Sequence, residues 1–416
     1  RINKVKKIIK NVFRKLGINI SRYIPDVSQN TVVSLKSKNN INGNMLLSYR
    51  IEPFLLKPGE ILSNSHTNYW ESFQIAMTFL EMGFNVDVID FRNRTFIPEK
   101  DYSILVSART NLERIANHLS KKCIKIAHLD TAHWVFNNHA SFKRGLDLLN
   151  RRNRTVTNNS LRIIESNLAI EYADYATILG NQFTIGTYEY ARKPIFRVPL
   201  PSCLTYPLKE KNLDSCRKNF LWFGSGGLVH KGLDLVIEAF MGMPDYNLTI
   251  CGPVQEEKEF ENIYYEALYK TPNIRTIGWV DVDSDLFKKI TDNCLAIIYP
   301  SCAEGQAGSV ITCMQTGLIP IVSNASGVDV HDFGIILANC SIDEIRKAIY
   351  KVSNLSDLEL KQMAYKTWAF ARSNHSRDCF AKEYKNVIQK IILNHQKYYT
   401  ILDIPALQTF QENNWG

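Results

Sequence analysis

From residue 44 to residue 372 the sequence alternates short apolar runs with longer segments whose apolar residues recur every three or four positions. The short runs predict buried β-strands, and the periodic segments predict helices that bury one face. Strands that alternate with helices along a chain favour a parallel sheet with helices on both faces. The predicted fold class is therefore α/β.

The alternation occurs in two successive parts of the chain. Strands are expected in the first part at 45–49, 86–91, 102–107, 123–128, 175–179 and 195–198, and in the second at 220–224, 247–251, 274–277, 295–299 and 319–323. The stretch "RVPLPSCLTYPLKEKNL" (197–213) between them is rich in Pro and polar residues, as domain linkers are. We expect domains at 44–205 and 210–372, then a helix and tail at 373–416. Two doubly wound domains facing each other form a ligand cleft at the carboxyl ends of their strands.

Positive charge is concentrated at the start of the sequence. Residues 1–22 contain eight basic residues and no acid, so the rest of the chain carries only +1 of the net +9. Apolar residues there fall at helical spacing, which predicts a basic amphipathic helix over residues 1–25. Such a helix can lie on an anionic membrane surface, at about 1 kcal/mol per basic residue, or it can be a solvated or docked terminal helix. Nucleic acid is not an expected partner, because the remaining chain is nearly neutral.

Composition limits the compartment and the cofactors. No apolar run approaches the roughly 20 residues that span a bilayer. The nine cysteines include no CxxC pair, which argues against a zinc site and for a reducing compartment. The acidic stretch "DVDSD" (281–285) precedes a periodic segment and predicts a helix N-cap rather than a metal site. We therefore expect a cytoplasmic protein, peripheral on the inner face of the membrane, without metal or cofactor.

Two stretches of the second part contain candidate site residues. In "FLWFGSGGLVHKGLDLVIEAF" (220–240) a strand runs into a glycine-rich turn and then Lys231. Free backbone N–H groups there, together with the Lys231 ammonium, would form an anion site suited to a diphosphate. The alternative for this stretch alone is a tight turn with a surface lysine. In "SCAEGQAGSVITCMQTGLIPIVS" (301–323) the lone carboxylate of Glu304 follows a buried strand, among small residues that let the backbone wrap a sugar and its phosphate.

The sequence resembles the GT-B retaining glycosyltransferases of the group 1 or family 4 type, which include many bacterial polysaccharide and lipopolysaccharide transferases. The resemblance is carried by "FGSGGLVHKGLDLVIEAF", "LTICGP", "NIRTIGWV" and "IIYPSCAEGQAGSVITCMQTGLIPIVS", in that order. It implies two Rossmann-like domains facing a central cleft, a nucleotide-sugar donor and no metal.

The resemblance also implies residue roles. Glu304, His128 and Lys231 match catalytic positions, with Glu304 holding the donor sugar and Lys231 its diphosphate. The matching acceptor-side residues are His66, Glu71 and His133. The matching donor-binding residues are Ser225, Gly226, Gly227, His230, Lys231, Gly278, Trp279, Val280, Gly305, Gln306, Ala307, Gly308, Ser309 and Thr312.

Two positions depart from the family pattern. The second acid of the Glu-x7-Glu motif is Thr312 here, so the contacts to the nucleotide must differ. The arginine that usually precedes the lysine by five residues is Gly226, and Arg109 or Arg192 is a candidate to replace its charge.

The function expected from this resemblance is transfer of a sugar from a nucleotide sugar to a glycan or lipid-linked acceptor, with retention, in cell-surface polysaccharide or lipopolysaccharide biosynthesis. Retention implies front-side displacement, in which Glu304 positions the sugar; an inverting reaction would need a base, for which His128 is the nearest candidate. The alternatives are another GT-B enzyme, such as a nucleotide-sugar epimerase or a polyol-phosphate transferase, and a non-catalytic GT-B binding module.

Overall fold

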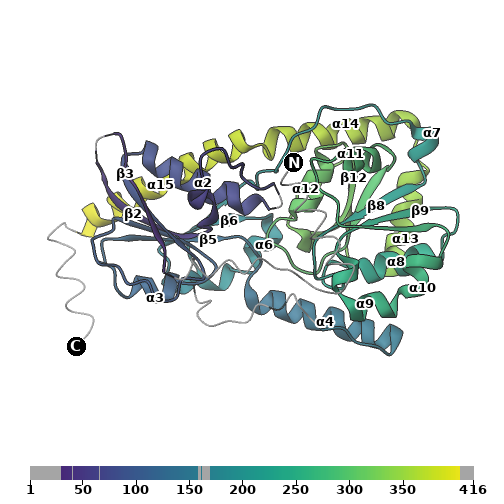
Figure 1. The fold of residues 1–416 in the computed structure, drawn as a ribbon, viewed down its shortest axis with the longest axis horizontal. Coiled ribbons are helices and arrows are strands. Elements are labelled where there is room, and N and C mark those ends of the chain that lie inside the picture. Colours follow the sequence, from purple (N-terminus) through teal and green to yellow (C-terminus); the bar gives the residue numbers. More distant parts are fainter. Residues whose placement is uncertain (1–29, 40, 65, 158–160, 162–168, 403–416) are drawn as a thin grey trace.

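A computed structural model describes residues 30–402 except 40, 65, 158–160 and 162–168. The expected helix at residues 1–25 lies outside these residues. The described chain forms two α/β domains side by side, each built on one sheet (Figure 1). The expected architecture of two Rossmann-like domains is confirmed. Among the described residues, no helix is both long and apolar enough to cross a membrane.

The first domain contains a seven-stranded sheet of order β1-β3-β2-β4-β5-β6-β7. Its strands are β1 (Val32–Leu35), β2 (Gly43–Tyr49), β3 (Phe84–Asp90), β4 (Ile104–Ala108), β5 (Ile124–Leu129), β6 (Tyr175–Leu179) and β7 (Ile195–Val198). Its helices are η2 (Glu52–Leu55), α2 (Thr67–Glu81), α3 (Leu112–Ala116), α4 (Trp134–Arg152), α5 (Ala169–Tyr172), α6 (Gln182–Gly186) and η3 (Glu189–Ala191).

Strand β1 was not expected, and it pairs antiparallel with β3 at the edge of an otherwise parallel sheet. Its four residues alternate between exposed and half-buried, so they form no continuous apolar run. The sheet therefore begins before residue 44, where the sequence analysis had placed the start of the domain.

The second domain contains a six-stranded parallel sheet of order β10-β9-β8-β11-β12-β13. Its strands are β8 (Asn219–Phe223), β9 (Asn247–Cys251), β10 (Ile274–Gly278), β11 (Ala296–Tyr299), β12 (Ile319–Ser323) and β13 (Ile335–Leu337). Its helices are α7 (Leu213–Cys216), α8 (Leu233–Met241), η4 (Val254–Glu256), α9 (Lys258–Ile263), α10 (Tyr265–Lys270), α11 (Asp285–Asp292), α12 (Gly308–Met314), η5 (Asn324–Ser326), α13 (Ile342–Ser353) and α14 (Asp357–Asn374).

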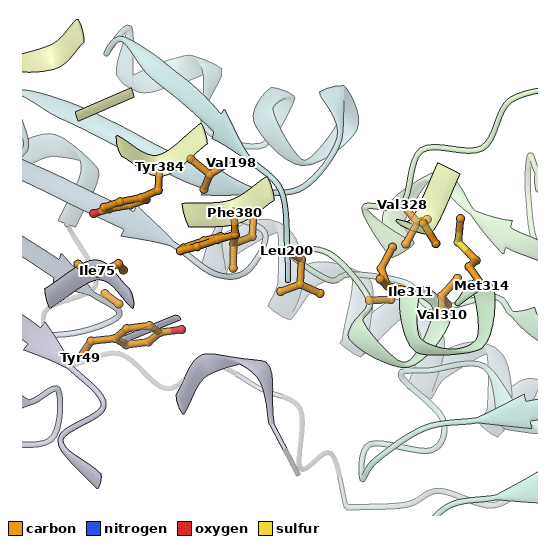
Figure 2. Packing of buried hydrophobic residues seen from close by; sticks show 14 of the residues in the cluster. Tyr49, Ile75, Val198, Leu200, Val310, Ile311, Met314, Val328, Phe380 and Tyr384 are labelled. Carbon is orange, nitrogen blue, oxygen red and sulfur yellow. The ribbon is translucent and has the colours of Figure 1, made fainter. Parts of the chain in front are cut away.

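The last helix, α15 (Arg377–Leu402), returns to the first domain and packs on α2 and β7 (Figure 1). Figure 2 shows Phe380 and Tyr384 of α15 near Ile75, with Leu200 between this group and Ile311 of α12. These residues belong to one buried cluster that continues from the first domain into the second. The apolar core therefore connects the two domains behind the cleft.

Helix α4 makes a second connection between the domains, along the opposite side of the molecule (Figure 1). Its Ser141 hydroxyl contacts His230 Nδ1 at 2.6 Å, and Arg144 donates to the carbonyl of Pro300 at 3.0 Å. Near the end of the helix, Arg151 pairs with Asp234 of α8. Polar contacts on α4 and apolar contacts on α15 thus fix the cleft from two sides.

His375 lies where the chain crosses between α14 and α15, fully buried, with Nδ1 2.9 Å from the carbonyl of Leu200. Burial lowers the pKa of His375 from 6.5 to about 4. The unfolded chain therefore binds this proton first, and the free energy of unfolding falls as pH decreases through the interval from about 6.5 to about 4. A shift of this size corresponds to about 3 kcal/mol at the acid end of the interval.

We expect His375→Gln to lose less stability than the wild type when the pH falls from about 7 to about 4.5, because Gln does not titrate. Urea unfolding at both pH values measures the difference. His118→Gln, at an exposed histidine, is the matched control. Equal losses in the wild type and in His375→Gln would contradict a buried neutral histidine.

Candidate active site

A cleft of about 620 Å³ opens at the carboxyl ends of the second domain's strands, with residues 61–64, 66 and 67 of the first domain on its other wall. Its volume is in the range of small-molecule sites. Many of the residues expected at the donor site line it. These are Ser225, Lys231, Trp279, Val280, Glu304, Ala307, Gly308, Ser309 and Thr312; His66, expected on the acceptor side, also lines the cleft.

Lys231 and Glu304, which are 73 positions apart in sequence, form an ion pair in this cleft, with 2.8 Å between Nζ and Oε1. Lys231 precedes α8 because Gly232 has φ +73 and allows the chain to turn there. Both side chains are largely buried, at 12% and 18% exposed. The two expected catalytic residues of the second domain are therefore brought together by the fold.

Glu304 is held as a carboxylate. Its Oε1 also accepts hydrogen bonds from the Tyr299 hydroxyl and the Ser301 hydroxyl, each at 3.1 Å. Burial alone would raise the pKa of Glu304, but the charge of Lys231 and the hydrogen bonds outweigh burial and lower the pKa to about 2. In turn, Glu304 raises the pKa of Lys231 against the opposing effect of burial. The other oxygen, Oε2, accepts no hydrogen bond from the described residues, so it can accept one from a ligand.

The glycine-rich turn differs from the expected anion site. The N–H groups of Gly227 and Leu228 donate to the carboxylate of Glu257, and neither Gly226 nor Gly227 lines the cleft. Glu257 lies between η4 and α9, 30 positions after Gly227. Of this turn, Gly224 and Ser225 face the cleft.

The loop after β10 forms the far wall of the cleft. Gly278 has φ +88, which Gly adopts without strain, and it is followed by Trp279 and Val280 in the lining. The Trp279 ring is 49% exposed, and its Nε1 donates to Asp281 at 3.2 Å. An exposed, hydrogen-bonded indole is suited to stacking on a planar ring such as a nucleotide base.

The turn 305–309 is divided between two roles. A Cβ on Gly305 would lie 2.4 Å from the carbonyl oxygen of Asp130, so the small residue permits contact between the domains. Gln306 accepts from the N–H of Leu200 and donates to the carbonyl of Gly327, which occupies its amide within the protein. Only the last three residues of the turn, Ala307, Gly308 and Ser309, line the cleft.

Of the four expected histidines, His128, His133 and His230 do not line the cleft. His128 has a fully buried side chain, with Nδ1 2.8 Å from the Thr177 hydroxyl and Nε2 3.9 Å from Glu71. Glu71 is itself buried and accepts from the Tyr49 hydroxyl at 3.0 Å. His230 contacts Ser141 and the carbonyl of Ala303. His66 is the one histidine in the described lining.

His133 lies beyond the cleft, at the start of α4. Its Nε2 is 3.0 Å from the Tyr190 hydroxyl, and its ring packs edge-on against Tyr188. The acceptor role expected of His133 and Glu71 therefore has no support from the cleft lining.

The departures from the family pattern have visible consequences. Thr312 lines the cleft, but its hydroxyl donates to the carbonyl of Gly308 one helical turn earlier. Arg109 pairs with Asp130 and Arg192 caps a short helix in the first domain; neither lines the cleft. Lys231 is the only Lys or Arg in the described lining, and it is already paired with Glu304.

Some residues that line the cleft were not among the predicted site residues. Tyr299 and Asp283 line the cleft, as do Cys203 of the linker and residues 61–64. Tyr299 ends strand β11, so its position at the ligand edge of the sheet was a usable signal. Among the described residues, no three His, Cys, Asp or Glu side chains are grouped so that they could hold a metal ion.

Residues 209–367 match the family model of glycosyl transferases group 1. The second domain is a group 1 glycosyltransferase domain. The matched region includes both Lys231 and Glu304, and it ends before α15. The resemblance to group 1 glycosyltransferases is thereby confirmed for this region, whereas retention and a role in polysaccharide synthesis stay predictions, and the fold of the whole chain is GT-B. No curated protein matches the chain by sequence.

Solved structures share the fold at low sequence identity. A sucrose-phosphate synthase from Thermosynechococcus elongatus is 12% identical, with a TM-score of 0.60 over 85% of this chain and 99% of that one. Anabaena HepE in complex with UDP is 12% identical, with a TM-score of 0.52 over 84% and 100%. TarM from S. aureus is 13% identical, with a TM-score of 0.46 over 68% of this chain and 54% of that one, so this chain spans about half of TarM.

Proposed function

We propose that the protein transfers a sugar, with retention of configuration, from a nucleoside-diphosphate sugar to a glycan or lipid-linked acceptor. The observation that carries the proposal is the buried pair of Lys231 and Glu304 at the floor of the cleft, inside the group 1 glycosyltransferase domain. A cation beside a carboxylate with one free oxygen matches the two ends of such a donor, its diphosphate and its sugar hydroxyls.

The reaction requires stabilisation of a departing diphosphate. Negative charge grows on the phosphate oxygens as the bond to the sugar breaks, and a fixed ammonium in a largely buried site stabilises that charge effectively. Lys231 is held in place by Glu304, so little reorganisation is needed when the donor binds. Glu304, kept ionised by its low pKa, accepts a hydrogen bond from a sugar hydroxyl through Oε2.

Retention requires an acceptor that approaches the face of the sugar from which the diphosphate leaves. Support for it is limited to the wall that the first domain contributes to the cleft, where an acceptor could bind. Oε1 of Glu304 already accepts hydrogen bonds from Lys231, Tyr299 and Ser301. These bonds suit a residue that positions the sugar better than one that attacks it as a covalent nucleophile.

The proposal is tested by incubating the protein with nucleotide sugars and a panel of acceptors. Anabaena HepE is described in complex with UDP and with UDP-glucose, so UDP-sugars are the first donors to try. Proton NMR of the new glycosidic bond should show the anomeric configuration of the donor. Inverted product would overturn retention, and altered sugar formed from donor alone would indicate an epimerase instead.

We also propose that the enzyme works at an anionic membrane surface, in the synthesis of a cell-surface polysaccharide or lipopolysaccharide. The support is the charge of the sequence, with eight basic residues and no acid in residues 1–22. Deleting residues 1–22 should abolish co-sedimentation with vesicles that contain phosphatidylglycerol, and high salt should weaken the binding of the intact chain. Activity on a water-soluble acceptor should be unchanged by the deletion. Vesicle binding that survives both the deletion and high salt would contradict the proposal.

A further inference from the structure

Three arginines meet at the ligand edge of the first domain's sheet. Arg50 follows β2, Arg92 follows β3 and Arg109 follows β4, three strands that are adjacent in the sheet. All three guanidinium groups lie over the ring of Phe91, at 5.1, 5.4 and 4.8 Å from its centroid. Ligands bind at this edge of parallel sheets, which makes the cluster a candidate binding site.

The hydrogen bonds of two of these arginines leave most of their donors unused. Arg50 donates to Glu52 through Nη1, and its Nε is buried without a partner. Arg109 donates to Asp130 through Nε. Neither guanidinium makes another hydrogen bond to the described residues, although each carries five N–H donors. Arg92, in contrast, holds both oxygens of Asp90.

The cluster is connected to the cleft through two aromatic contacts. Arg50 lies 5.4 Å from the centroid of the Tyr69 ring, and that ring is 6.2 Å from His66, which lines the cleft. Burial, followed by the charges of Arg50 and Arg109, lowers the pKa of His66. His66 is therefore neutral at physiological pH, and the positive charge on this side of the cleft comes from the arginines.

Arg109 is fixed in an unusual backbone conformation. Its φ is +66, a region that residues with a side chain rarely adopt, directly after β4. Such conformations are found preferentially at functional sites, where the surroundings hold them. The ion pair with Asp130 and the Phe91 ring supply that support here.

We propose that Arg50 and Arg109 bind an anionic group of the acceptor, a phosphate or a carboxylate. Only the assignment of this anion to the acceptor rests on the proposed function. Binding of an oxyanion by the two arginines does not depend on which reaction the protein catalyses. Guanidinium groups bind both oxyanions through paired hydrogen bonds, and stacking on aromatic rings keeps them oriented. The arginines belong to the first domain and do not themselves line the cleft, to which they are linked through Tyr69 and His66.

Binding of glucose 6-phosphate, glucuronate and glucose, measured by isothermal titration calorimetry, tests the proposal. We expect at least one of the two charged sugars to bind more tightly than glucose, and their ranking to distinguish a phosphate from a carboxylate site. Arg50→Gln and Arg109→Gln should each weaken that binding about 10- to 100-fold. Arg275→Gln, at an exposed arginine on β10, should have no effect.

Two further measurements separate this inference from the proposed function. Binding of UDP should be unchanged in Arg50→Gln, because the donor site belongs to the second domain. Melting temperatures identify a variant that has lost its fold, and Arg109→Lys, which keeps the charge, should retain part of the binding. Equal binding of the three sugars, or full binding of a charged sugar by Arg50→Gln and Arg109→Gln, would overturn the inference. If the wild-type protein does not bind UDP, that result would count against the proposed function and not against this inference.

Discussion

Replacing Glu304 by Gln is expected to lower turnover by about two to three orders of magnitude. The amide keeps the size of the side chain but removes the charge that holds Lys231 at 2.8 Å. The donor sugar then loses a charged acceptor on its hydroxyl, and the diphosphate meets a less well-placed ammonium. Initial rates at saturating donor measure the change in kcat.

The matched control for this substitution is Glu266→Gln, at an exposed glutamate on α10 that pairs with Lys270. It should leave kcat unchanged. Wild-type turnover in Glu304→Gln would remove Glu304 from the site, whereas a melting temperature far below that of the wild type would show that the loss is one of folding.

Replacing Lys231 by Met is expected to affect both stability and donor binding. Breaking a buried pair by removing one partner leaves the other charge uncompensated and costs about 3 kcal/mol or more. Glu304 is 18% exposed and would be left with only two neutral donors, Tyr299 and Ser301. The affinity for a nucleoside diphosphate should also fall by about 100-fold, because Lys231 is the only cation in the described lining.

The double variant Lys231→Met with Glu304→Gln separates these two effects. It should recover much of the stability lost in Lys231→Met, since no unpaired charge remains, but none of the donor affinity. Urea unfolding gives the stabilities and calorimetry with UDP gives the affinities. Lys288→Met, at an exposed lysine of α11, is the control. A double variant no more stable than Lys231→Met would show that the two side chains are not coupled.

The sequence pattern predicted most elements because the buried positions of a strand or helix are occupied by apolar residues at the period of that element. Strands β9 and β12 have the bounds that their apolar runs indicate. Strand β1 was missed because a short edge strand buries one side only and forms no apolar run.

The candidate site was only partly predictable. Lys231 and Glu304 each follow a strand of the same parallel sheet, so their meeting at its carboxyl edge is a consequence of the topology. The glycine-rich turn was misjudged because its amides are taken by Glu257, a residue 30 positions away with no local signal. Arg50 and Arg92 likewise have no local sequence signal, because only the order of the strands brings them together around Phe91.

The sequence by itself determined the α/β class, the division into two domains, the family of the second domain and the positions of Lys231 and Glu304. These properties depend on neighbours within one or two helical turns, or on short motifs that follow a strand. Only the tertiary structure decided that His128 and His230 are buried, that Gly305 and Gln306 join the domains, and that three arginines share one aromatic ring. Burial and pairing at these positions arise from segments far apart in the chain, and their contacts exist only once the two sheets and the crossing helices have packed.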